Sequence, residues 1–184
     1  TLKAIGDNRK SDYLKTVLQE IQKGNEVHTL QTRLIISLNR EYPIEDYLDS
    51  FEVYKNFEDS ELKKLIVGID YCGNEQNERH KLFDIYPILK KFKDEGLKIT
   101  VHSGESQNYQ KFDFDAFLPD RISHTYYYKD TEYEEVMKRK IPIEICPTGS
   151  YCCKELNNFK DITFNKYYKK IVEMDINNEK SKYE

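Results

Sequence analysis

A histidine and a glutamate stand three residues apart where a short apolar run of this sequence ends. Residues 97–106 read LKITVHSGES, so that His102 closes the run and Glu105 follows it. A neutral imidazole binds zinc well, and a nearby carboxylate that is not a ligand can move protons. Zinc lowers the pKa of bound water toward ~7, which supplies hydroxide at neutral pH. The pair therefore indicates metal-assisted hydrolysis, and Gly104 between them would let a planar substrate approach the backbone closely.

Polar side chains follow other apolar runs in the same way. Asp70 ends the run LIVGID and is followed by Gly73 and Glu75, while His124 ends RISH. Chemistry in parallel α/β folds lies at the carboxyl ends of the strands, where such groups converge. Each residue has a plainer alternative. A buried histidine is more often a packed, hydrogen-bonded residue, an aspartate after a strand often caps the next helix, and Glu75 can be a solvated loop charge.

The elements that must position these residues alternate along the chain. Helical spacing of apolar residues predicts helices at 11–23, 44–57, 81–93, 131–139 and 162–170. Apolar runs of strand length lie at 33–38, 65–70, 98–102, 121–128, 142–146 and 171–176. A continuous apolar run places apolar side chains on both faces of a strand. Such runs are typical of a parallel sheet that is covered on both faces. An α/β fold of about six βα units follows, either an open doubly wound sheet or a TIM-type (β/α)8 barrel that lacks about two units.

Composition narrows the class of protein. The 184 residues make one domain, with 38% apolar and 34% charged residues, and 15 Tyr and 9 Phe supply bulk for the core. The net charge of −4 and the lack of a basic patch argue against a nucleic-acid partner. The apolar runs are too short to span a bilayer, so no membrane partner is expected. Four cysteines with no Cys-x-x-Cys pair predict a reducing, cytoplasmic location.

Four motifs, in order, resemble the family of adenosine deaminases and adenosine-deaminase-like proteins. The stretches VGIDYCGNE, TVHSGE, LPDRISH and IPIEICPTGS resemble the family patterns G-x-D-x-x-G-x-E, V-H-A-G-E, R-I-G-H-G and E-x-C-P-x-S-N. The resemblance covers about residues 11 to 160. It implies a (β/α)8 barrel with one zinc ion at its mouth and hydrolytic conversion of a 6-amino purine to a 6-oxo purine. The substrate would be a small-molecule purine nucleoside or nucleotide. The motifs look closest to the adenosine-deaminase-like branch, some members of which act on N6-modified AMP.

The resemblance also implies roles for single residues. His102 matches the zinc-ligand histidine, and Glu105 matches the carboxylate that protonates N1 of the purine as hydroxide attacks C6. His124 matches the catalytic histidine that orients and stabilises the attacking hydroxide. On the substrate side, Gly73 matches the glycine whose backbone amide contacts purine N3. Asp70 matches an acid close to the substrate, and its role is expected to be structural.

The sequence departs from the family pattern at both ends. The family takes two further zinc ligands from an H-x-H on its first strand, and no H-x-H exists here. Residues 1–184 are therefore expected to form a single barrel domain that is N-terminally incomplete. In the last turn, MDINNEKS, Glu179 aligns with the ligand aspartate and Asp175 is the other candidate, while Lys180 takes the place of a second acid and disfavours a cation. R-I-G-H-G has become RISHT, which loses both glycines.

Three functions stay open at this point. The first is a zinc-dependent adenosine or adenylate deaminase, with one zinc ion in the complete protein. The second is a catalytically inactive relic that binds a purine or an interaction partner, because His102 and Glu179 alone are too few for a zinc site, which needs three protein ligands and an open position. The third is another metal-dependent amidohydrolase, since one barrel hosts many chemistries. The glutamate after H-S-G favours the purine deaminase. The oligomeric state is left open.

Overall fold

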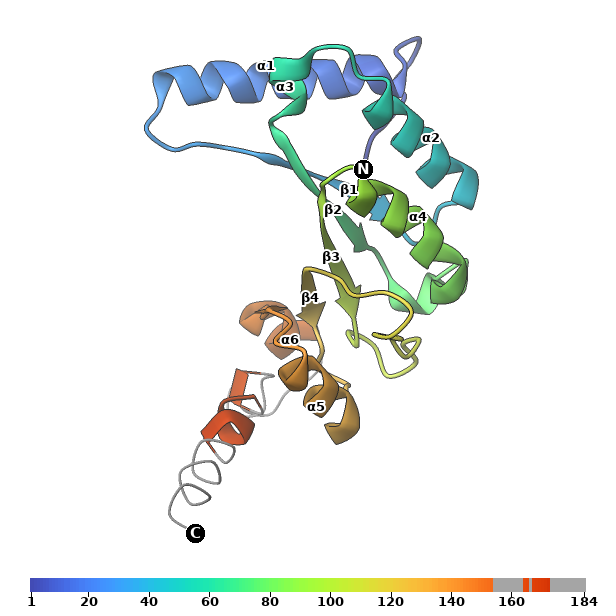
Figure 1. Cartoon of the computed structure of the whole chain (residues 1–184), viewed down its shortest axis with the longest axis vertical. Coiled ribbons are helices and arrows are strands. Elements are labelled where there is room, and N and C mark those ends of the chain that lie inside the picture. Colours follow the sequence, from blue (N-terminus) through green and yellow to red (C-terminus); the bar gives the residue numbers. More distant parts are fainter. Residues whose placement is uncertain (154–163, 166, 173–184) are drawn as a thin grey trace.

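The computed structural model of the chain describes residues 1–153, 164–165 and 167–172. Its strands form one five-stranded parallel sheet in the order β1-β2-β3-β4-β5 (Figure 1). The strands are β1 Leu34–Asn39, β2 Ile66–Cys72, β3 Lys98–Ser103, β4 Arg121–His124 and β5 Ile143–Glu144. Each strand lies beside the next one in the chain. This order is that of a barrel wall, whereas the order of a doubly wound sheet reverses at a switch point.

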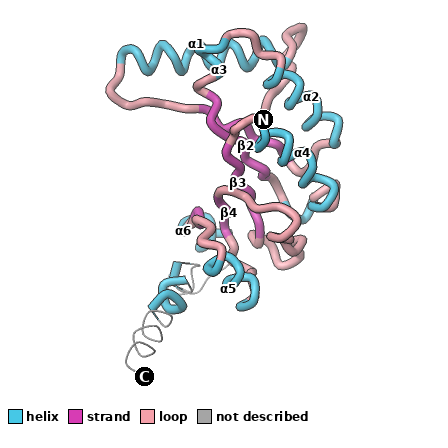
Figure 2. The backbone as a smooth tube through the Cα atoms, in the orientation of Figure 1, coloured by secondary structure: helices cyan, strands magenta, loops and turns pink. Residues whose placement is uncertain are grey.

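Helices precede β1, follow β5 and connect the strands, except that the segment 104–120 between β3 and β4 contains no helix. They are α1 Lys10–Val27, α2 Ile44–Lys55, α3 Ser60–Lys63, the 3-10 helix η1 Glu75–Asn77, α4 Leu82–Asp94, α5 Asp130–Lys138 and α6 Pro147–Cys153. In Figure 2, α2 and α4 lie side by side along the sheet, while α5 and α6 lie near β4. Among the helices that the structure describes, none is both long enough and apolar enough to cross a membrane.

The core lies between the helices and one face of the sheet. Helix α4 buries residues at helical spacing, and the rings of Phe92 on α4 and Phe51 on α2 meet edge to face with their centroids 5.0 Å apart. Strand β3 is buried along almost its whole length, as the apolar run predicts. On β1 and β2, however, Ile35 and Val67 are 38% and 37% exposed. The prediction of cover on both faces therefore fails for these two strands within the described part of the chain.

The structure confirms five of the six predicted strands and shortens two of them. The run 121–128 leaves the sheet after His124, because His124 and Thr125 have φ values of 69° and 50°, which are incompatible with extended backbone. The run 142–146 contributes only Ile143–Glu144 to the sheet. The strand predicted at 171–176 is wrong at its first two residues, which are helical, and its other residues lie outside the described ones. Five of the about six predicted βα units thus have a strand among the described residues.

Candidate active site

The carboxyl ends of β2, β3 and β4 bring four of the predicted residues together. The register of the sheet pairs Ser103 with His124, which places that histidine beside the end of β3. His102 lies between two partners: its Nδ1 atom is 3.1 Å from Nε2 of His124, and its Nε2 atom is 3.2 Å from Oδ1 of Asp70. Oε2 of Glu105 is 3.7 Å from Nε2 of His124. The convergence predicted from the strand ends is therefore present.

A cavity of about 530 Å³ lies against these side chains. Its lining consists of Gly73, Asn74, Glu75, Gln76, His102, Glu105, Ser106 and His124. One wall is the segment that follows β2, and the other carries the two histidines and Glu105. Four of the residues predicted from the sequence line the cavity, and Asp70 stands behind His102. Glu179 and its alternative Asp175 lie outside the described residues.

Asp70 orients the imidazole of His102. Burial raises the pKa of the Asp70 carboxyl, but the hydrogen bond and charge of His102, together with hydrogen bonds from Cys72 and Ser37, outweigh it and hold the pKa below its usual value. Burial, followed by the charge of Asp70, raises the pKa of the Cys72 thiol to about 11, so that this thiol stays protonated. A carboxylate behind an imidazole fixes the orientation and tautomer of the ring and makes its other nitrogen a better ligand. The expectation of a structural role for Asp70 fits this geometry.

The donor set at this site suits a divalent metal ion. One ligand atom from each of His102, Glu105 and His124 lies within 4.8 Å of the others. Imidazole nitrogen and carboxylate oxygen are the donors that zinc takes in catalytic sites, where three protein ligands leave one position open. The family resemblance implies His102 as the one histidine ligand, whereas the fold places His124 and Glu105 close enough to join it. These three residues can therefore hold a metal.

Position 104 requires glycine for a reason other than the predicted one. Gly104 has φ of 72°, and a Cβ atom there would lie 2.6 Å from the ring of Tyr128 and 3.2 Å from the Cα atom of Thr125. The side of the glycine that a methyl group would occupy is thus filled by protein. The residue is required by the turn and by the packing of Tyr128, and close approach of a planar substrate does not explain it.

Gly73 shows the same two requirements at the end of β2. Its φ is 106°, and a Cβ atom there would clash with Oδ1 of Asn39. Oδ1 of Asn39 also accepts a hydrogen bond from the amide of Glu41, so it cannot move away freely. The cavity wall at Gly73 is therefore backbone, as a contact between its amide and a purine ring would need.

Two charged residues at the site are buried, and only one of them, Glu75, stands among the polar residues identified from the sequence. Arg40, the residue after β1, is 1% exposed, and Glu75 is 7% exposed. Glu75 accepts hydrogen bonds from the amides of Gly104 and Ser106. The alternative of a solvated loop charge is therefore wrong for Glu75. The signal that could have found Arg40 is its position, since it directly follows a buried strand at the functional edge of the sheet.

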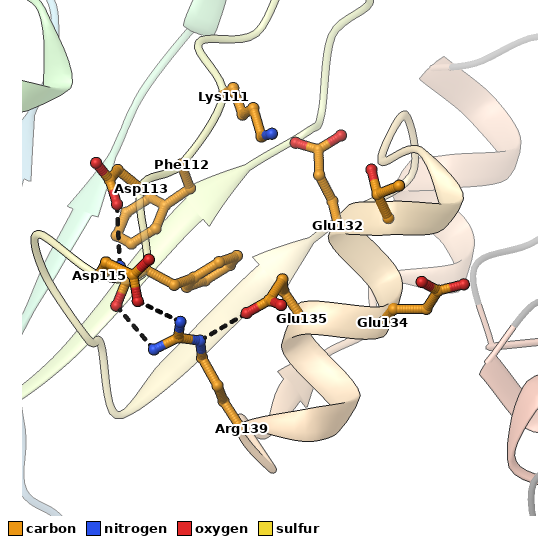
Figure 3. Close-up of a pocket in the computed structure, with 10 residues that line it drawn as sticks. Lys111, Phe112, Asp113, Asp115, Glu132, Glu134, Glu135 and Arg139 are labelled. Carbon is orange, nitrogen blue, oxygen red and sulfur yellow. Dashed lines mark hydrogen bonds and ion pairs between the residues drawn. The ribbon is translucent and has the colours of Figure 1, made fainter.

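A second cavity, of about 540 Å³, lies between the segment 111–115 and helix α5 (Figure 3). Three of its charged groups pair with one another. Arg139 donates from Nε to Glu135 at 2.9 Å and also pairs with Asp115. None of the predicted site residues that the structure describes lines this cavity. Volume alone does not separate the two cavities, but the convergence of histidines and carboxylates does.

Comparison with known proteins agrees with this geometry. The family profile described as "Adenosine deaminase" matches residues 4–183. The adenosine deaminase of Clostridium perfringens strain 13 is 27% identical over 172 residues, which cover 91% of this chain and 50% of that protein. The chain thus spans about half the length of the curated relatives that it matches.

Solved structures give the same picture. The N6-mAMP deaminase of Arabidopsis is 26% identical with a TM-score of 0.76, covering 92% of this chain and 52% of that one. The Arabidopsis ADAL protein complexed with IMP is 26% identical with a TM-score of 0.75, covering 92% of this chain and 51% of that one. These neighbours are TIM barrels, and the five parallel strands superpose on about half of such a barrel. The predicted partial (β/α) barrel is confirmed.

Proposed function

The chain belongs to the adenosine deaminase family, and from this membership we propose that it serves the zinc-dependent hydrolytic deamination of adenosine or an adenine nucleotide. The observation that carries the proposal is the meeting of His102, Glu105 and His124 within 4.8 Å at the edge of one cavity. In the reaction, the oxygen of water adds to C6 of the purine and the C6–N6 bond breaks. The 6-amino purine becomes a 6-oxo purine, and ammonia or an amine leaves.

Each residue has a stated task in this proposal. His102, oriented by Asp70, would hold the zinc ion, which would lower the pKa of water toward ~7 so that hydroxide is available at neutral pH. Glu105 and His124 also lie close enough to bind a metal, but in this proposal they act on the purine and the water. Glu105 gives a proton to N1 of the purine, which draws electrons away from C6. His124 accepts a hydrogen bond from the attacking water and orients it. Gly73 offers its backbone amide to N3 of the ring.

We propose further that residues 1–184 belong to a single barrel domain that needs additional βα units to close. Two observations support this: the chain spans about half of its curated relatives, and the apolar side chains of Ile35 and Val67 are left exposed on the sheet. Glu179, or Asp175 in its place, would add a ligand from the last turn. Three cysteines of the described chain, Cys72, Cys146 and Cys152, are free thiols, which supports a cytoplasmic location.

The substrate proposed is a small purine nucleoside or 5′-monophosphate. Support comes from relatives named as adenosine deaminases and from neighbours described as an N6-mAMP deaminase and as complexes with IMP or GMP. A relic that binds purines without turnover is the second candidate. It is favoured by the sequence, in which no H-x-H supplies two further ligands and Lys180 takes the place of an acid in the last turn.

The test measures metal content and product release on the same sample of the full-length protein. Elemental analysis gives the zinc per chain, and ammonia or methylamine release is followed with adenosine, AMP and N6-methyl-AMP. We expect about one zinc ion per chain and turnover of at least one of these purines. The variant Glu134→Gln, which changes a surface residue of α5 at the second cavity, serves as a control for handling and should retain wild-type turnover. Stoichiometric zinc without turnover of any purine would contradict the proposed activity.

A further inference from the structure

Three buried charges form a cluster beside the site. Arg40 is 1% exposed, and the side chains of Glu75 and Glu78 are 2% and 3% exposed. One guanidinium nitrogen of Arg40 lies 3.6 Å from Oε1 of Glu75 and 3.7 Å from Oε2 of Glu78, and the guanidinium stands over the ring of Tyr71. Arg40 is therefore shared about equally between two carboxylates. Their roles differ only in what else each one contacts.

Glu75 binds the turn that presents Glu105. The amide of Gly104 donates to Oε1 of Glu75 at 2.8 Å, and the amide of Ser106 donates to Oε2 at 2.7 Å. These two amides stand on either side of Glu105, so one carboxylate fixes the backbone before and after it. Hydrogen bonds to an ionised acceptor are stronger than those between neutral groups.

Arg40 binds the same turn from the strand side. A second guanidinium nitrogen donates to the backbone carbonyl of His102 at 2.6 Å. The cluster thus touches the chain at His102, Gly104 and Ser106 and encloses the segment that carries both predicted reactive groups. Glu78, by contrast, accepts a hydrogen bond from the hydroxyl of Tyr71 at 3.0 Å.

We propose that Glu75 is a positioning residue for Glu105, with Arg40 as its countercharge. The inference rests on the proposed function, in which Glu105 must reach N1 of the purine. A displacement of about 1 Å at a reacting group lowers the rate on the order of 10²-fold, and the side chain of Glu105 is partly exposed in an open cavity. Its placement therefore depends on its backbone, which Glu75 holds on both sides.

The experiment compares Glu75→Gln with Glu78→Gln in the full-length protein. Both substitutions remove one buried charge beside Arg40, but only the first changes the turn. A glutamine at 75 can accept one amide with its oxygen, while its NH₂ group faces the other amide and cannot accept. We expect Glu75→Gln to lower kcat on the order of 10²-fold with KM nearly unchanged, and Glu78→Gln to keep kcat.

A second readout does not depend on turnover. Amide hydrogen exchange by NMR at Gly104 and Ser106 should accelerate about tenfold in Glu75→Gln and stay unchanged in Glu78→Gln. If Glu75→Gln fails to fold, Glu75→Asp keeps the charge for Arg40 but withdraws the carboxylate from the amides, and the same loss of kcat is expected.

The outcomes separate the two claims. Equal loss of kcat in the two glutamine variants, or unchanged exchange at both amides in Glu75→Gln, would overturn the positioning role. If the wild-type protein turns over no purine, the proposed function is wrong, and the exchange rates alone decide whether Glu75 holds the turn.

Discussion

The turns after β3 and β4 build the two sides of the same site by different means. The turn after β3 places Gly104 at φ of 72° and binds both flanking amides to a buried carboxylate. The turn after β4 also needs left-handed backbone but holds it with His124 and Thr125. A left-handed backbone is unfavourable for non-glycine residues, above all for β-branched ones. The turn after β3 is thus unstrained and held by a buried carboxylate, whereas the turn after β4 stores strain.

Neighbouring groups fix the strained turn from several directions. Thr125 is fully buried, and its amide donates to the carbonyl of Ser103 at 2.9 Å. Its carbonyl accepts a hydrogen bond from the hydroxyl of Tyr133 at 2.8 Å. Strained residues persist only where the surroundings determine them in this way. The loss of both glycines from RISHT therefore does not abolish the left-handed backbone that brings His124 to His102.

The largest effect is expected when Glu105, which the turn after β3 carries, is replaced. If Glu105 is the proton donor, Glu105→Gln should lower kcat for purine deamination by about 10² to 10⁴-fold. The free energy of unfolding should change little, because the side chain of Glu105 is 35% exposed. Steady-state kinetics and urea unfolding of the full-length protein measure both. Retention of kcat in this variant would show that Glu105 is not the acid.

The second prediction breaks the turn after β3 at its glycine. Gly104→Ala adds a methyl group 2.6 Å from the ring of Tyr128 on a left-handed backbone, and we expect it to lower the free energy of unfolding by about 2–4 kcal/mol. Gly96→Ala is the matched control. Gly96 also has positive φ, of 90°, but nothing lies within 4 Å of its added methyl group, so a loss of about 1 kcal/mol is expected. Equal losses in the two variants would mean that the packing of Tyr128 on Gly104 contributes nothing.

The third prediction removes one support from the turn after β4. Tyr133→Phe leaves the buried carbonyl of Thr125 without this donor and should lower the free energy of unfolding by about 1–2 kcal/mol. Tyr128→Phe makes the same chemical change at the other turn, where the tyrosine hydroxyl donates to the hydroxyl of Ser103 at 2.9 Å. Because no strain is stored there, the loss should be smaller, about 0.5–1 kcal/mol. A larger loss from Tyr128→Phe would reverse the comparison.

The smallest effect is expected at the amino ends of β3 and β4, the ends that lie opposite the site. Asp120 accepts a hydrogen bond from the amide of Ile99 at 2.9 Å and pairs with Lys98 at 3.1 Å. Burial raises the pKa of Asp120, but this amide and the nearby lysines outweigh it and hold the pKa below its usual value. Since the folded-state pKa is lowered, the stabilisation is present above the unfolded pKa of about 3.9 and is lost as the pH falls through the folded value.

Urea unfolding of wild type and Asp120→Asn, from roughly pH 7 down to roughly pH 3, measures this stabilisation. That range includes the pH at which a carboxyl titrates. The wild type should be more stable by about 1 kcal/mol or less at neutral pH, and the difference should shrink below about pH 4. A difference that grows as the pH falls would contradict the sign of the pKa shift.

The sequence predicts the part of the site that depends on strand ends. Five apolar runs became strands, and polar residues at their carboxyl ends met, because a parallel sheet aligns those ends at one edge. The burial of Glu75 could not be predicted, since its partners are backbone amides about thirty residues away. Ile171 and Val172 looked like strand residues because they begin a short apolar run, and such runs do not distinguish strand from helix.

The most direct test of the central claim is the position of the metal in a crystal of the full-length protein. Anomalous diffraction at the zinc edge locates the ion without reference to activity. The account predicts one zinc peak per chain at the carboxyl ends of β3 and β4, about 2.0–2.1 Å from an imidazole nitrogen of His102. A zinc peak elsewhere in the protein, or no metal at His102 in crystals grown with zinc, would contradict it.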